Sequence, residues 1–74
     1  MEFAYQHLQQ ARHHISEIDE HIVAQRAFVG EKRAQGRETA EEERLLFHLL
    51  EAQRIALAHR RLILERLEKP APQQ

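Results

Sequence analysis

Cysteine is missing from this chain of 74 residues, and proline and glycine are nearly missing, with two of each. Without cysteine the chain can form neither a disulfide nor a thiolate zinc site, which are common supports of so small a domain. Both prolines fall within the last five residues, so only Gly30 and Gly36 interrupt the helix-forming residues before them. The sequence therefore predicts long helices that are stabilised by packing or by association of chains.

No charge of one sign dominates, since 11 Lys and Arg stand against 12 Asp and Glu, for a formal net charge of -1. Domains that bind the phosphate backbone of nucleic acids are usually strongly basic, so nucleic acid is not expected as the main ligand. No apolar run approaches the ~20 residues that span a bilayer. The first residues, MEFAYQHLQQ, lack the basic and then apolar order of a secretion signal. We expect a cytoplasmic protein without membrane contact.

Two helices joined by a short turn are predicted from signals near the middle of the chain. Gly36 suits the left-handed residue that ends a helix. Thr39 suits the N-cap of the next helix, and Glu42 three residues later completes a capping-box pattern. Acidic residues 41–43 then fill the first turn, where the helix dipole favours negative charge. We predict one domain over residues 1–69, with a helix at about 2–35, a turn at 36–38, a helix at about 40–68 and a disordered tail at 70–74.

An apolar seam with alternating spacings of three and four residues runs along the first predicted helix. This heptad pattern is typical of helices that pack lengthwise. The apolar face of the second helix is wider than one partner helix needs, and exposed apolar surface marks an interaction site. The expected fold class is all-α, a two-helix antiparallel hairpin that dimerises into a four-helix bundle. The residues predicted for the core and the dimer interface are Leu8, Ile15, Ile18, Ile22, Val29, Leu46, Leu49, Leu50, Leu57, Ile63, Leu64 and Leu67.

Three polar residues, Gln25, Gln53 and Arg60, fall in or near these apolar faces. Buried polar residues can fix the register and the partner of packed helices. A long polar side chain can equally lie at the rim of a face and reach water with its end. We expect the rim position for all three.

Histidines recur every seven residues along the first helix, at His7, His14 and His21. Seven residues rise about 10.5 Å, so no two members of this row can bind one metal ion together. The candidate metal ligands with helical spacing are two pairs, His14 with Glu17 and Glu17 with His21, but no HExxH motif accompanies them. We expect no metal and no cofactor, and we interpret the row as the border of a packing face. The alternatives are a His-based metal-binding protein and a pH-responsive one, since histidine charges near neutral pH.

A catalytic centre is not expected, because Ser16, the one serine, lies in mid-helix and no glycine-rich phosphate loop occurs. The sequence favours a non-enzymatic regulator or adaptor that acts through protein–protein contacts, as a homodimer or with a protein partner. Phe47, Arg54 and Arg61 project away from the predicted core and are the candidate partner surface. An RNA-binding bundle is the alternative for this face, although glutamates among the arginines favour a solvated surface.

The second half of the chain resembles a group of short proteobacterial proteins that form helical hairpins. The matching residues are Gly36-Arg37-Glu38-Thr39, Leu45-Leu46, Glu51 and His59-Arg60 followed by apolar residues, and the segment HIVAQRAFVGEKRAQG is similar to their first helix. The resemblance covers residues ~15–67, because such hairpins carry turn and core signals on both arms. It implies a helical hairpin and a bacterial source, and it implies no established activity.

Overall fold

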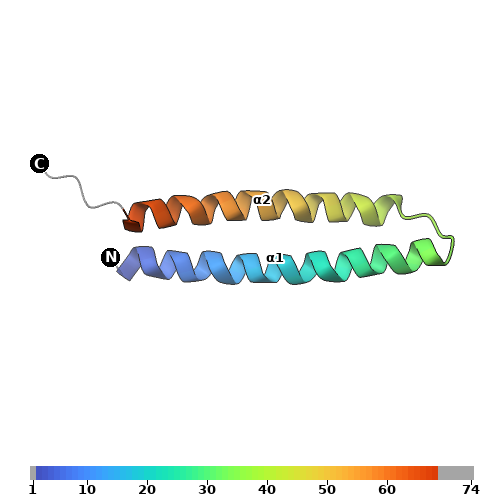
Figure 1. The fold of residues 1–74 in the computed structure, drawn as a ribbon, viewed down its shortest axis with the longest axis horizontal. Coiled ribbons are helices and arrows are strands. Elements are labelled where there is room, and N and C mark those ends of the chain that lie inside the picture. Colours follow the sequence, from blue (N-terminus) through green and yellow to red (C-terminus); the bar gives the residue numbers. More distant parts are fainter. Residues whose placement is uncertain (1, 69–74) are drawn as a thin grey trace, which may run out of the picture.

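The computed structural model describes the backbone of residues 2–68 and the side chains of residues 5–68. Two helices fill this range, α1 at Glu2–Ala34 and α2 at Ala40–Glu68, and they lie antiparallel and side by side (Figure 1). Their lengths are roughly 50 and 43 Å at the usual rise per residue. The predicted all-α hairpin is confirmed, and the predicted disordered tail at 70–74 lies outside the described residues.

The turn between the helices follows from one glycine. Gly36 has a φ of 70°, in the left-handed region that glycine adopts without steric penalty. This conformation lets the Arg37 N–H donate to the Lys32 carbonyl at 2.9 Å and the Gly36 N–H donate to the Arg33 carbonyl at 3.0 Å. These two bonds make a Schellman motif, which satisfies carbonyls that the end of α1 would otherwise leave open. The sequence placed this helix end within one residue of its observed position.

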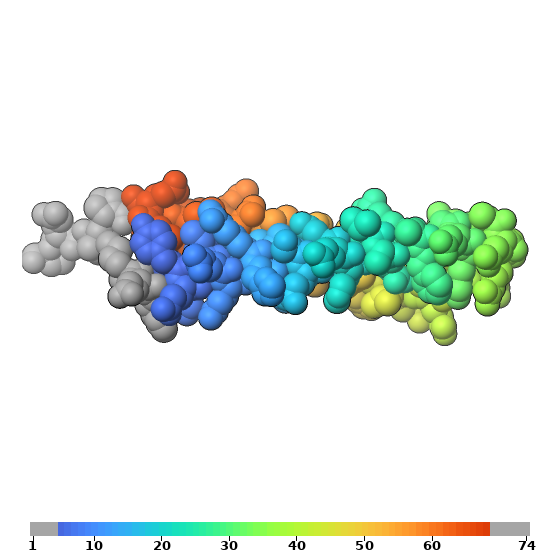
Figure 2. All heavy atoms as spheres, turned by 90° about the horizontal axis from the view of Figure 1, so that it is seen from below, coloured from blue at the N-terminus to red at the C-terminus, as the bar shows by residue number. Residues whose placement is uncertain are grey.

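The core is a single seam between the two helices. Ile15, Ile18 and Ile22 of α1 pack with Ala56 of α2 in the middle of the hairpin. A second buried set, Leu8, Ala11 and Ile63, closes the open end, where the helices begin and finish. Figure 2 shows that α2 emerges on one side of α1 near the open end and on the other side near the turn. The helices therefore wrap around each other, as a heptad seam requires.

Most residues predicted for the core and the dimer interface are buried or partly buried in the single chain. Leu8, Ile15, Ile18, Ile22, Val29 and Ile63 are buried. Leu46, Leu49, Leu50, Leu64 and Leu67 are partly buried and pack against the seam. Leu57 is different, because 38% of it stays exposed, so it lies outside the core of the single hairpin. Burial of Leu57 requires another chain.

Two of the seam's polar residues do more than border it. The Gln25 side chain donates to the Glu42 carbonyl of α2 at 3.0 Å, and the Gln53 side chain donates to the Asp19 carboxylate of α1 at 2.8 Å. Both glutamines are partly buried, in agreement with the expected rim positions, and each in addition connects the helices. Arg60 is partly buried. Such cross-helix bonds select one register among those that an apolar seam would accept.

Neither helix, within the part of the chain that the structure describes, has a stretch apolar enough and long enough to cross a membrane.

Candidate interaction surfaces

A two-helix seam leaves two flanks, one on each side of the line where α1 and α2 meet. Residues seven apart on a supercoiled helix follow one line, so each flank consists of parallel rows. On one flank a hollow brings Arg26 and Arg33 of α1 beside Phe47 and Leu50 of α2. On the other, a hollow joins His21 of α1 to Leu45 of α2. The two hollows therefore show which rows of α1 and α2 lie on the same side of the hairpin. The row of Arg26 shares one side with Phe47 and Leu50, and the row of His21 shares the other side with Leu45.

The first side is named the arginine flank here. Its rows combine a line of arginines on α1, a line of leucines beside the seam on α2, and an outer line on α2 that begins at Phe47. The members are Arg12, Asp19, Arg26 and Arg33 on α1, then Glu43, Leu50, Leu57 and Leu64, then Phe47, Arg54, Arg61 and Glu68 on α2.

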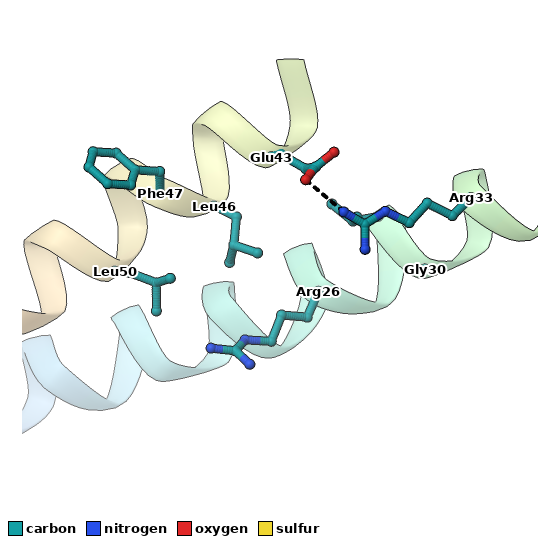
Figure 3. Close-up of a pocket in the computed structure, with 8 residues that line it drawn as sticks. Arg26, Gly30, Arg33, Glu43, Leu46, Phe47 and Leu50 are labelled. Carbon is teal, nitrogen blue, oxygen red and sulfur yellow. Dashed lines mark hydrogen bonds and ion pairs between the residues drawn. The ribbon is translucent and has the colours of Figure 1, made fainter. Parts of the chain in front are cut away.

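Two hollows follow this flank along the hairpin. One, of about 420 Å³, lies toward the turn, where Arg26 runs along the seam and the Phe47 ring points away from α1 (Figure 3). The other, of about 950 Å³, lies farther along α2, and its lining extends over the outer side of that helix to Leu62. It combines leucine side chains, the guanidinium groups of arginines and two carboxylates: Leu57, Leu62 and Leu64, Arg54, Arg60 and Arg61, and Glu65 and Glu68. Both hollows are shallow surfaces on the hairpin. Each presents leucine carbon next to guanidinium groups.

The predicted partner surface lies on this flank. Phe47 is 62% exposed, and Arg54 and Arg61 are also exposed, so all three side chains face outward in one row. The Arg54 guanidinium donates to the Glu51 carboxylate of the preceding turn at 3.3 Å. The structure therefore brings the three residues to one side of the hairpin, and it adds a leucine row that the sequence predicted only as part of the combined core and dimer interface. The seven-residue spacing of Leu50, Leu57 and Leu64 was the signal that could have separated them from the seam.

The opposite side is named the histidine flank here. It carries large apolar side chains that the hairpin leaves exposed, with Leu45 at 50%, Ile55 at 60% and Leu62 at 60%. At neutral pH the charged groups on its rows are Glu41 and Arg66, of opposite sign. The rows are His7, His14, His21 and Phe28 on α1, then Leu45, Ala52, His59 and Arg66, then Glu41, His48, Ile55 and Leu62 on α2.

The candidate metal ligands do not converge. His14, Glu17 and His21 are all exposed on α1. The Glu17 carboxylate lies 3.7 Å from the ring of His13, on the side away from the seam. Among the described residues, no three His, Asp or Glu side chains are placed to hold a metal ion together.

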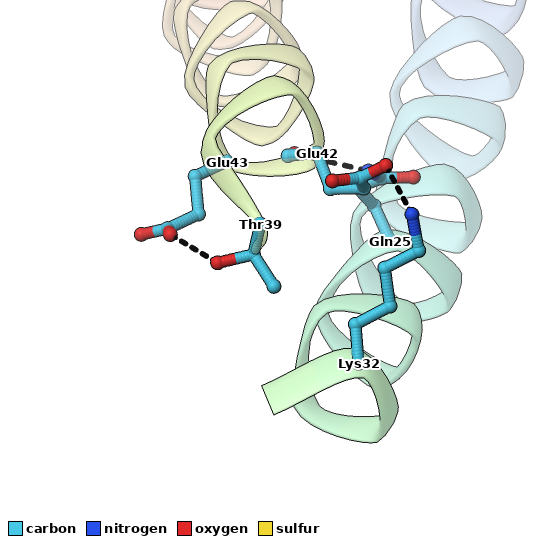
Figure 4. A network of polar contacts seen from close by, with 5 residues as sticks. All are labelled: Gln25, Lys32, Thr39, Glu42 and Glu43. Atoms are coloured by element: carbon cyan, nitrogen blue, oxygen red, sulfur yellow. Dashed lines mark hydrogen bonds and ion pairs between the residues drawn. The ribbon is translucent and has the colours of Figure 1, made fainter. Parts of the chain in front are cut away.

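A polar clamp joins the helices at the turn end of the hairpin (Figure 4). The Lys32 ammonium donates to the Glu42 carboxylate at 2.6 Å, and both side chains are largely shielded, with 18% and 16% exposed. The same ammonium lies 5.0 Å from the centre of the Phe28 ring. This hydrogen bond from Lys32, the Glu42 backbone and the charges of Lys32 and Arg37 lower the pKa of Glu42 below its usual value.

The neighbouring carboxylate belongs to the same clamp. The Thr39 hydroxyl donates to the Glu43 carboxylate at 2.5 Å, and Arg33 donates to its other oxygen at 2.6 Å. The Thr39 hydroxyl, and then the Arg33 guanidinium, lower the pKa of Glu43. The predicted capping box is therefore rearranged. The Glu42 side chain pairs with Lys32 of the other helix, and the Thr39 hydroxyl donates a hydrogen bond to Glu43. Local sequence spacing could not show this, because Lys32 and Arg33 belong to the other helix.

No family model matches the chain, and no curated protein or solved structure is significantly similar to it. Its function is therefore inferred from the two flanks.

Proposed function

We propose that this chain is a small, non-enzymatic bacterial regulator or adaptor that acts through protein–protein contacts as a homodimeric helical bundle. The carrying observation is the amount of large apolar surface that the hairpin cannot cover. A two-stranded coiled coil needs one seam, yet this hairpin exposes Leu45, Ile55 and Leu62 on one side and Phe47 and Leu57 on the other. Apolar surface of this kind is typical of protein interfaces.

The histidine flank is the side that suits a second copy. In a two-fold symmetric dimer, the same flank of both copies forms the interface. A flank with an excess of charge of one sign would therefore repel the identical flank of the second copy. On the rows of the histidine flank the charges of Glu41 and Arg66 balance, so these rows have no positive excess like that of the arginine flank. Its apolar side chains would be buried between two hairpins, which completes a four-helix bundle.

Acid should weaken this dimer, because the flank carries histidines on both helices. The flank carries His7, His14 and His21 on α1 and His48 and His59 on α2, and histidine side chains carry positive charge when acid protonates them. They would add to the charge of Arg66, while Glu41 and the adjacent Glu17 and Glu31 offset only part of it. The self-association is thus expected to depend on pH.

The bacterial source and the absence of catalysis are part of the same proposal. They are supported by the resemblance of residues ~15–67 to short proteobacterial hairpins and by the lack of a nucleophile set or phosphate loop in the sequence. A cytoplasmic location agrees with the lack of cysteine.

Sedimentation equilibrium at neutral pH tests the dimer. We expect a mass near twice the 8.8 kDa of the chain, falling toward one chain at about pH 5.5. The double substitution Ile55→Asn and Leu62→Asn should give a monomer at neutral pH. Val23→Asn is the matched control, because Val23 is 69% exposed on the outer side of α1, away from the histidine flank. A monomeric wild-type protein at neutral pH would contradict the proposal.

A further inference from the structure

The leucine row of the arginine flank has the geometry of a docking line for another helix. Leu50, Leu57 and Leu64 repeat every seven residues directly beside the seam. They cover about 21 Å along α2, which corresponds to four turns of helix. Apolar residues at such a third heptad position are used by helices that pack against two neighbours at once. In this hairpin α1 is one neighbour of α2, and the second place is open.

Positive charge borders this leucine row on both sides. On the three rows of the flank, five arginines stand against the carboxylates of Asp19, Glu43 and Glu68, although the whole chain has a net charge of -1. Arg33 and Arg54 are neutralised by Glu43 and Glu51. Arg12, Arg26 and Arg61 have no ion-pair partner among residues 5–68.

A second copy of the chain fits this flank poorly. Two-fold symmetry would set the same positive excess against itself, and like charges brought together at an interface oppose binding. Nucleic acid fits poorly for a different reason, because phosphates would pair with the arginines but leave the leucine row in water. A helix with an apolar stripe and acidic borders satisfies both features together.

We propose that the arginine flank binds an amphipathic, acidic helix of a partner protein. Its apolar stripe packs along Leu50, Leu57 and Leu64, and its carboxylates pair with Arg12 and Arg26 on α1 and with Arg61 on α2. This inference rests on the proposed function and gives the chemistry of the partner. The dimer occupies the histidine flank, so self-association and partner binding use opposite sides of the hairpin.

Two synthetic helical peptides of about three heptads test the inference directly. Both carry leucine at the two seam positions; one has glutamate at the flanking positions and the other has lysine there. Binding of each fluorescently labelled peptide to the full chain is measured by fluorescence anisotropy at neutral pH. The glutamate peptide should bind and the lysine peptide should not, and added salt should weaken the binding.

Charge-reversal variants locate the site. The double variant Arg26→Glu and Arg61→Glu should weaken binding of the glutamate peptide by about tenfold or more. The matched control is the double variant Arg37→Glu and Arg44→Glu, because both arginines are exposed and lie off the flank. Leu57→Asn should also weaken binding, whereas Ile55→Asn should change only the sedimentation of the protein. Circular dichroism confirms that each variant remains helical.

Several results would overturn the inference. If both peptides bind equally, or if neither binds, an acidic helix is excluded as the partner of the arginine flank. A short RNA that binds at physiological salt and is lost in the double arginine variant makes the flank a nucleic-acid site instead. Loss of the dimer in Leu57→Asn assigns the leucine row to a second copy. Failure of peptide binding with an intact dimer refutes this inference alone, whereas a monomeric wild-type protein refutes the proposed function.

Discussion

The two ends of the hairpin are held together by different chemistry. At the turn, the polar clamp joins the helices through side chains of Lys32 and Arg33 on the carboxylates of Glu42 and Glu43. At the open end, the contact is apolar, with Leu8, Ala11 and Ile63 buried together. Both ends belong to the same seam and continue the same heptad spacing.

This difference shows how stability and register are divided between residue types. An apolar heptad seam repeats itself every seven residues, so a helix shifted by one heptad would still meet apolar residues. The polar clamp has no such repeat, because Lys32 meets Glu42 in one register alone. The leucines and isoleucines thus supply most of the stabilisation, and the clamp selects the alignment.

The largest change in the free energy of unfolding is expected from substitutions in the apolar seam. Ile18→Ala removes a side chain that is 6% exposed at the centre of the hairpin, and it should lower the free energy of unfolding by about 2–4 kcal/mol. Leu67→Ala at the open end should cost less, because Leu67 is only partly buried. Urea unfolding followed by circular dichroism at one protein concentration measures both. Equal losses would show that the open end is packed as tightly as the middle.

The two glycines should respond in opposite directions. Gly36→Ala places a side chain at a φ of 70° and should destabilise the turn by about 1 kcal/mol. Gly30→Ala should stabilise the protein by a similar amount, because Gly30 is exposed inside α1 and an added methyl group meets nothing within 4 Å. Thermal unfolding of both variants measures the pair. A stabilising Gly36→Ala would contradict the left-handed turn.

The clamp should make stability depend on pH, while the open end should not. The pKa values of Glu42 and Glu43 are lowered in the folded chain, so their stabilisation is complete above the usual value of 4.5 and is lost as pH falls through the lowered values. The midpoint of urea unfolding should therefore fall on acidification below that value. The double variant Glu42→Gln and Glu43→Gln should lose most of this dependence, and exposed Glu31→Gln is the control. An unchanged acid profile in the double variant would place the dependence elsewhere.

The smallest effects should come from single ion pairs, and they should differ between the two cations. Lys32→Ala removes a shielded pair and a contact with Phe28, whereas Arg33→Ala removes a pair whose arginine side chain is 61% exposed. Exposed pairs contribute little because solvent and salt screen them. The thermal midpoint should therefore fall more for Lys32→Ala than for Arg33→Ala. The reverse order would mean that shielding does not decide the strength of the clamp.

Much of the fold was accessible from the sequence, and the candidate surfaces were accessible only in part. The spacing of Ile15, Ile18 and Ile22 predicted the seam of α1, and Phe47 was correctly placed outside it. Leu57 was predicted for the core and the dimer interface together, because a wheel count shows the width of an apolar face and not how much of it one partner helix covers. The arginines of α1 were not connected with the leucines of α2, since that connection depends on which sides of the two helices meet.

The sequence by itself determined the two helices, the turn at Gly36 and the apolar seam. These depend on local conformational preference and on spacing within one helix, which short segments of chain express alone. Only the tertiary structure decided that Glu42 pairs with Lys32 and that Gln25 and Gln53 connect the helices. It also decided which rows of α2 share a flank with the arginines of α1 and which share a flank with its histidines. These features depend on the rotation and register of one helix against the other, which both helices determine together.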